Sequence, residues 1–148
     1  MLTYRNMETA DLPEVFELRT STLENVITHE ELERDYGLTP LTLAQAMEAS
    51  VRGWVCCDDD RIVGFAMGDS ATGEMNVVAV LPGYEGRGIG KKVLGLVQDW
   101  LFGSGHTEVW LMATPDPGIR AYGFYRRLGW RTTGELIDGE EKMVLRRP

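Results

Sequence analysis

The sequence predicts a single mixed α/β domain spanning residues 1–148. Three observations support this prediction. The chain has 148 residues, and single domains cluster around 100 to 150 residues. Apolar residues follow a helical period in the first third of the chain and alternate along strands from Gly53 onward. Short turns rather than linkers separate the segments, which gives the order β, α, α, β, β, β, α, β, α, β, β.

The first third is expected to form one short strand and then helical hairpins. Residues 2–4 alternate apolar and polar side chains, as a strand does. Residues 11–14 supply an N-cap Asp and a capping-box Glu for a helix, and residues 28–31 repeat that pattern. Residues 39–40 place a capping Thr before a Pro suited to a first helical turn. The apolar face of the first helix is expected to carry Leu12, Val15, Phe16 and Leu23.

The middle of the chain predicts three consecutive antiparallel strands. Alternating segments at 54–57 and 62–67 flank an all-Asp turn, and a third segment at 74–81 follows a turn that contains Gly73. Cys56 and Cys57 are neighbours, so their side chains point to opposite faces of a strand and a disulfide between them is not expected.

The last third alternates helices and strands. Apolar residues recur at helical spacing over 89–101, and a Gly-Ser-Gly sequence stops that helix. The remaining elements are a buried strand at 109–113, a helix opened by Asp116 and Pro117 and ended by Gly129, and two strands, 130–136 and 142–145, joined by a turn at Asp138 and Gly139.

A cluster of glycines between a strand and a helix is the strongest functional signal. At such a junction the first backbone N–H groups of the helix lack partners, and glycines let an anion approach them. Arg87, Lys91 and Lys92 add local positive charge, so residues 85–92 predict a diphosphate site. The spacing excludes a P-loop and a dinucleotide fingerprint, because Glu85 and Lys91 stand where glycines are required. A turn that merely breaks the strand remains the alternative.

Composition excludes several other classes. The 15 Lys and Arg against 23 Asp and Glu give a net charge of −8, which disfavours nucleic acid. No apolar stretch reaches the roughly 18 residues of a membrane span, and no leader pattern opens the chain, so a cytoplasmic protein is expected. His29 and His106 have no partners at ligand spacing, so no metal is expected. The acidic run at 30–35 is either a solvated helix face or an attractor for a cationic amine.

Two segments resemble motifs of the GNAT N-acetyltransferase superfamily. Residues 78–91, which begin Val-Ala-Val-Leu-Pro and contain Glu-Gly-Arg-Gly-Ile-Gly-Lys, resemble its acetyl-coenzyme A motif, and residues 119–130 resemble its second motif. The resemblance covers the whole element order and implies a mostly antiparallel sheet flanked by helices, with a splayed central strand pair. Two positions depart from the family pattern, which usually has Gln or Arg at Glu85 and often Asn at Gly118.

The resemblance implies transfer of an acetyl group from acetyl-CoA to a primary amine, by direct attack through a tetrahedral intermediate. Glu74 is the implied base, the backbone N–H of Val80 the implied oxyanion donor, and Tyr125 the implied acid for the leaving thiolate. Glu74 as a solvated turn residue and Tyr125 as a core residue remain open. The implied cofactor-binding residues are Val78, Ala79, Val80, Gly86, Arg87, Gly88, Ile89, Gly90 and Lys91.

The acceptor is not readable from the sequence, and it is expected to be a small-molecule or peptide amine. A homodimer is left open. Two rival functions also remain at this point: a non-catalytic CoA-binding sensor or interaction module, and a nucleotide-binding module that uses the same anion turn.

Overall fold

A computed structural model of the chain describes residues 1–22, 26–116 and 119–148. Its strands form one seven-stranded sheet with the order β1-β2-β3-β4-β5-β7-β6. The strands are β1 (Leu2–Asn6), β2 (Val51–Asp58), β3 (Arg61–Asp69), β4 (Glu74–Val80), β5 (Glu108–Ala113), β6 (Arg131–Ile137) and β7 (Glu140–Arg146). The helices are η1 (Thr9–Asp11), α1 (Leu12–Arg19), α2 (His29–Tyr36), α3 (Pro40–Ala49), α4 (Ile89–Gly103) and α5 (Arg120–Arg127).

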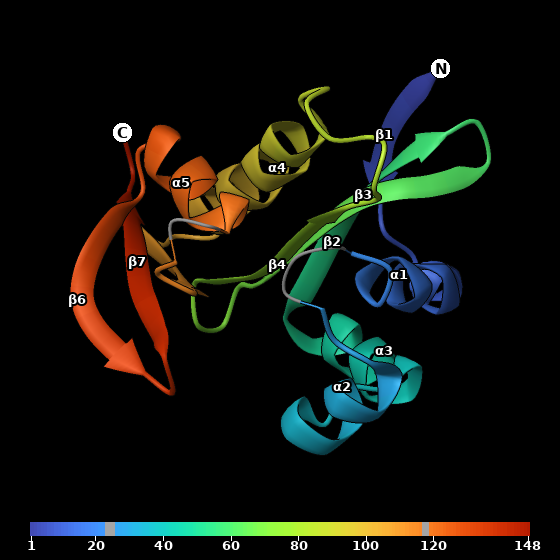
Figure 1. Ribbon diagram of the computed structural model, residues 1–148, viewed down its shortest axis with the longest axis horizontal. Helices are drawn as coiled ribbons and strands as arrows, with labels where there is room; N and C mark the ends of the chain where they lie inside the picture. Colours follow the sequence, from blue (N-terminus) through green and yellow to red (C-terminus); the bar gives the residue numbers. More distant parts are fainter. Residues whose placement is uncertain (23–25, 117–118) are drawn as a thin grey trace.

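Helices cover both faces of this sheet. In Figure 1, α4 and α5 lie on one side of the strands, and α1, α2 and α3 lie on the other. The core between α4 and the sheet is completely buried, and its largest members include Phe65, Ile89, Leu94 and Leu101. Every neighbouring strand pair is antiparallel except β4 and β5. The mostly antiparallel α/β sheet expected from the sequence is therefore confirmed.

The N-terminal third contains three α-helices, one more than the predicted element order. The two later helix starts are confirmed in detail, because the side chains of Thr28 and Thr39 each accept a hydrogen bond from the third residue of their helix. Asp11 is the N-cap residue of α1, as predicted, but its side chain does not cap the helix. The Asp11 carboxylate accepts from the Glu8 N–H at 2.8 Å and pairs with Arg5, so it stabilises the preceding η1 turn and not α1.

Helix α5 begins later than predicted. Asp116 belongs to a turn in which the Ile119 N–H donates to the Asp116 carbonyl at 2.9 Å, and the helix starts only at Arg120. Its end at Gly129 and the hairpin turn at Asp138 and Gly139 are confirmed, and all three residues have positive φ. Leu23, Pro117 and Gly118, which the sequence predictions also used, lie outside the described residues.

The central strands β4 and β5 separate soon after they meet. They are parallel and pair only at Glu74 and Trp110, whereas β4 pairs with β3 along its whole length. A register shift at Met67 and Gly68 of β3 leaves Asn76 of β4 as an extra, bulged residue. The splayed strand pair implied by the resemblance is thus present, and beyond Glu74 no strand among the described residues pairs with this edge of β4.

Candidate functional site

The free edge of β4 presents backbone groups at alternate residues. The Leu81 N–H donates to the Val63 carbonyl of β3 at 2.8 Å, which fixes the direction of the groups before it. Successive backbone groups of a strand point to opposite sides, so those of Ala79 also face β3. The N–H and C=O groups of Val78 and Val80 point the other way, into the opening between β4 and β5. This edge can pair with an extended, amide-containing ligand.

The glycine turn after β4 leaves its amides without partners. Gly86 and Gly88 have φ of 78° and 79°, a conformation that favours glycine, and Gly88 is the N-cap of α4 with no side chain capping that end. The first amide after this turn that has a backbone acceptor is that of Lys92, which donates to the Gly88 carbonyl at 3.0 Å. Within the described part of the chain, no protein acceptor satisfies the amides of residues 85–91. They are available to an anion.

Three side chains hold this turn in place. The Tyr84 hydroxyl donates to Asp58 at 2.6 Å, which ties the turn to the end of β2 and lowers the pKa of Asp58. The guanidinium of Arg87 stacks 4.9 Å above the Tyr84 ring. Glu85 forms an ion pair with Arg120 at the start of α5. The turn is therefore anchored to β2 on one side and to α5 on the other.

Tyr125 lies on α5 among aromatic neighbours. Its side chain is 7% exposed, and its ring centroid lies 5.5 Å from that of Phe124 and 6.1 Å from that of Trp130. Burial raises the pKa of Tyr125 to about 12, and the positive charge of Arg19 opposes that rise. Arg19 belongs to α1, which lies on the other side of the strands from α5 in Figure 1, so a charge from another layer of the fold acts on this phenol. The phenol stays protonated at neutral pH and can donate a proton or a hydrogen bond.

Glu74 lies where β4 and β5 meet. It is half-buried, and its pKa is raised, first by burial and then by the negative charges of Asp69 and Glu140. The turn before it is fixed by Trp110, whose backbone N–H and indole N–H donate to Gly73 and Thr72 at 3.1 and 3.0 Å. A carboxylate with a raised pKa accepts a proton more readily than an exposed one, which suits a general base.

The predicted catalytic residues do not all converge on one point. Glu74 and Val80 are the first and last residues of a seven-residue strand, so roughly 20 Å of extended chain separates them. Val78, on the same edge as Val80, lies closer to Glu74. Sequence reasoning also missed Arg19, Asp58 and Arg120, because each reaches the site from an element distant in the chain.

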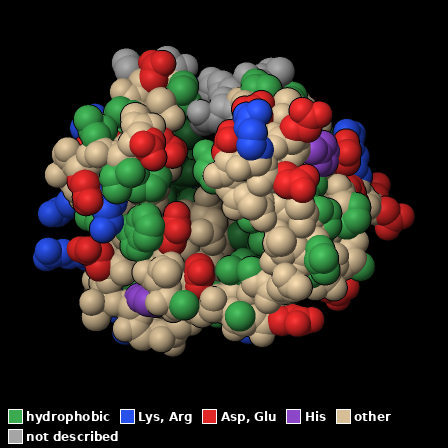
Figure 2. All heavy atoms as spheres, turned by 90° about the horizontal axis from the view of Figure 1, so that it is seen from below, with side chains coloured by type: hydrophobic (Ala, Val, Ile, Leu, Met, Phe, Trp, Pro, Cys, Tyr) green, Lys and Arg blue, Asp and Glu red, His purple; other side chains and the backbone are tan. Residues whose placement is uncertain are grey.

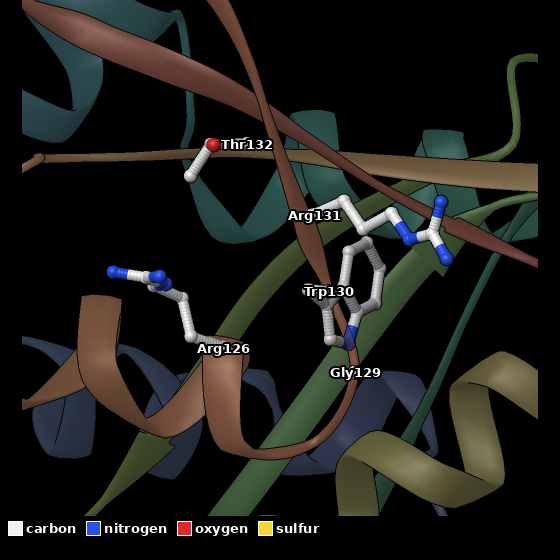
Figure 3. Close-up of a pocket in the computed structure, with 5 residues that line it drawn as sticks. All are labelled: Arg126, Gly129, Trp130, Arg131 and Thr132. Atoms are coloured by element: carbon white, nitrogen blue, oxygen red, sulfur yellow. The ribbon is translucent and has the colours of Figure 1, made fainter.

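Two surface pockets lie outside the opening. A pocket of about 340 Å³ at the end of α5 is lined by Arg126, Gly129, Trp130, Arg131 and Thr132. In Figure 3 the guanidinium groups of Arg126 and Arg131 lie on opposite sides of strand β6. A pocket of about 270 Å³ runs along α4 from the glycine turn and is lined by Gly88, Lys91, Lys92, Gly95, Leu96 and Asp99. Figure 2, viewed from the α2 and α3 side, shows a hollow between two masses of the protein, with apolar side chains in its depth.

The described residues contain no group of three or more His, Cys, Asp or Glu side chains arranged to hold a metal ion. No helix in the described part of the chain is long and apolar enough to cross a membrane.

The sequence pattern of the Acetyltransferase (GNAT) family matches residues 12–130. The chain belongs to this family. Both motifs and the open strand pair lie within the matched range or at its end, so the GNAT resemblance predicted from residues 78–91 and 119–130 is confirmed. Acetyltransferases of the GNAT family transfer acetyl groups to amine acceptors.

Relatives of this GNAT chain are found among sequences and solved structures. An uncharacterized N-acetyltransferase of Mycobacterium bovis is 37% identical over 83 residues, which cover 51% of this chain and 50% of the relative, so the match spans about half the length of each. The fold matches that of the PaiA N-acetyltransferase of Thermoplasma acidophilum, solved with coenzyme A, with a TM-score of 0.83, 15% identity and 99% coverage of both chains. The yncA protein of Salmonella typhimurium, solved with acetyl-CoA, matches with a TM-score of 0.74, 17% identity and coverage of 99% and 94%.

Proposed function

We propose that this chain is an N-acetyltransferase that moves the acetyl group of acetyl-CoA to a primary amine by direct attack. One observation carries the proposal: the unpaired edge of β4, which ends at Val80, leads within five residues into the unpaired amides of the glycine turn. Acetyl-CoA has a matching arrangement, with a diphosphate at one end and an arm containing two amides that leads to the thioester. The turn would hold the diphosphate and the edge at Val78 and Val80 would hold the arm.

The chain's own groups then have separate tasks in the reaction. An alkyl amine of pKa about 10 is only about 0.1% neutral at pH 7, so a base must remove a proton, and Glu74 would accept it through water. A backbone N–H on the open edge of β4 would stabilise the oxygen of the tetrahedral intermediate. We assign this donor to Val78 in place of Val80, because Val78 is nearer to Glu74.

Collapse of the intermediate breaks the carbon–sulfur bond. The electron pair goes to sulfur, and the resulting thiolate accepts a hydrogen bond or proton from the buried Tyr125 hydroxyl. The products are the N-acetylated amine and coenzyme A, and no acyl group is held by the protein. The PaiA and yncA proteins were solved with coenzyme A and acetyl-CoA, which supports this choice of donor.

Release of thiol from acetyl-CoA across a panel of amines tests the proposal directly. The panel should include small alkyl amines, peptide N-termini and lysine peptides, because the acceptor class is open. Cys56 and Cys57 are free but buried, and burial raises the pKa of both thiols, so the protein itself adds little signal in a thiol assay. Amine-dependent thiol release is expected, and its absence with every amine would contradict catalysis.

Ligand-dependent thermal stability separates the rival functions. A ligand at 100 times its Kd adds about 2.7 kcal/mol, which raises Tm by roughly 5 to 10 °C in a domain of this size. Acetyl-CoA is expected to produce this rise and ATP is not. Stabilisation by acetyl-CoA without turnover would indicate a CoA-binding sensor, whereas stabilisation by ATP alone would indicate a nucleotide-binding module.

A further inference from the structure

Glu85 places a negative charge at the turn proposed to bind a diphosphate. It directly precedes the unpaired amides of residues 86–91, and its side chain is 30% exposed. A carboxylate and a diphosphate within a Debye length repel each other, so an unneutralised Glu85 would weaken binding at these amides. The chain therefore needs a way to offset this charge.

Arg120 supplies the opposing charge from another element. It is the first residue of α5, and its guanidinium forms an ion pair with Glu85. The pair joins the turn before α4 to the helix that follows β5, so it links the two sides of the opening between β4 and β5. Because the Arg120 side chain is 63% exposed, this ion pair adds little to folding stability. Its main effect is on the local charge at the turn.

We propose that Arg120 is a positioning residue that acts through Glu85: it neutralises the carboxylate and holds it toward α5, away from the amides, and thereby sets the affinity for the diphosphate of CoA. This inference rests on the proposed function. It explains how a chain with an acidic residue at this position keeps an anion site at the same turn. It also assigns Arg120 a role in cofactor affinity and none in the chemical step.

A double-mutant cycle tests the inference through the dissociation constant of CoA, measured by titration calorimetry. Arg120→Gln leaves Glu85 unpaired and is expected to weaken CoA binding about threefold to tenfold, and Glu85→Gln is expected to leave binding equal or tighter. The double variant has neither charge, so its dissociation constant is expected to return to within about twofold of the unmodified protein. In 0.5 M salt the differences are expected to shrink, because the Debye length falls to about 4 Å.

Three controls separate this role from a structural one. Arg120→Lys keeps the charge and is expected to restore affinity. Arg127→Gln removes an equivalent charge about 10 Å further along α5 and is expected to leave CoA binding unchanged. In steady-state assays Arg120→Gln is expected to raise the KM for acetyl-CoA while kcat stays the same.

Distinct outcomes would overturn the inference. A double variant as weak as Arg120→Gln would mean that Arg120 contacts the ligand directly and not through Glu85. Equal dissociation constants in all four proteins would remove any role for the pair and leave the proposed function intact. No CoA binding by the unmodified protein would overturn the proposed function, and this inference with it.

Discussion

Replacing Tyr125 with Phe tests the proposed proton donor at the leaving thiolate. The substitution removes one hydroxyl and keeps the ring that packs against Phe124 and Trp130. The Tyr125 hydroxyl makes no hydrogen bond to the described residues, so folding stability is expected to change by less than about 1 kcal/mol. Any large change in rate would then report on the reaction.

The pKa of Tyr125 fixes the expected size of that change. The phenol has a pKa of about 12, and an alkyl thiol has a pKa of about 8.5, so complete proton transfer to the thiolate is uphill by roughly 5 kcal/mol. Tyr125 should therefore act mainly by donating a hydrogen bond as charge develops on sulfur. A hydrogen bond to a charged group contributes about 1.5 to 3 kcal/mol, which predicts a fall in kcat of roughly 10- to 100-fold.

The assay is steady-state thiol release, with CoA binding and Tm measured on the same proteins. Tyr122→Phe is the matched control, because it removes a hydroxyl from the same helix, where Tyr122 donates to Glu141 at 2.9 Å. Its kcat is expected to stay within about twofold of the unmodified protein. Tyr125→Phe with unchanged kcat and unchanged CoA affinity would refute the role assigned to Tyr125.

Three further predictions concern the base and the turn. Burial raises the pKa of Glu74 above its ordinary value near 4.5, so ionising this carboxyl lowers the stability of the fold as pH rises through that range. Glu74→Gln is therefore expected to raise Tm at pH 7, to lower kcat/KM, and to abolish the acidic limb of the pH profile of kcat/KM. An unchanged profile would remove Glu74 as the base. Tyr84→Phe loses the bond to Asp58 and is expected to raise the KM for acetyl-CoA about twofold to fivefold with kcat unchanged, whereas a change in kcat alone would contradict an anchoring role. Gly88→Ala at φ 79° is expected to lower stability by about 1 to 2 kcal/mol, seen as a fall in Tm, and an equal Tm would show that the turn relaxes.

Local signals in the sequence predicted the elements that depend on neighbouring residues. Thr28 and Thr39 cap their helices through contacts three residues away, and Asp138 and Gly139 form a turn through their own backbone angles. Asp11 occupies the N-cap position of α1, but its side chain does not cap the helix, because its carboxylate accepts instead from Arg5 and from the Glu8 N–H, each at 2.8 Å. Tertiary contacts of this kind override local patterns, and no spacing rule reveals them.

The candidate site shows the same division. The glycine turn could be predicted because its function depends on backbone amides and on glycines within a few residues. The charged partners at the site could not be predicted, since the charge of Arg19 on α1 acts on Tyr125 of α5, and Arg120 of α5 pairs with Glu85 of the turn. The separation of β4 from β5 was available only through the family resemblance, because strand pairing depends on residues far apart in the chain.

The side chains along the edge of β4 can change in evolution without loss of a ligand contact made by that edge. Its contact with a ligand would be made by the peptide groups of Val78 and Val80, which every amino acid except proline carries in full. Side-chain replacement along the strand leaves such a contact in place, provided that the strand keeps its register. Evolutionary drift at these positions is therefore compatible with a constant ligand, in keeping with a shared fold at 15% identity.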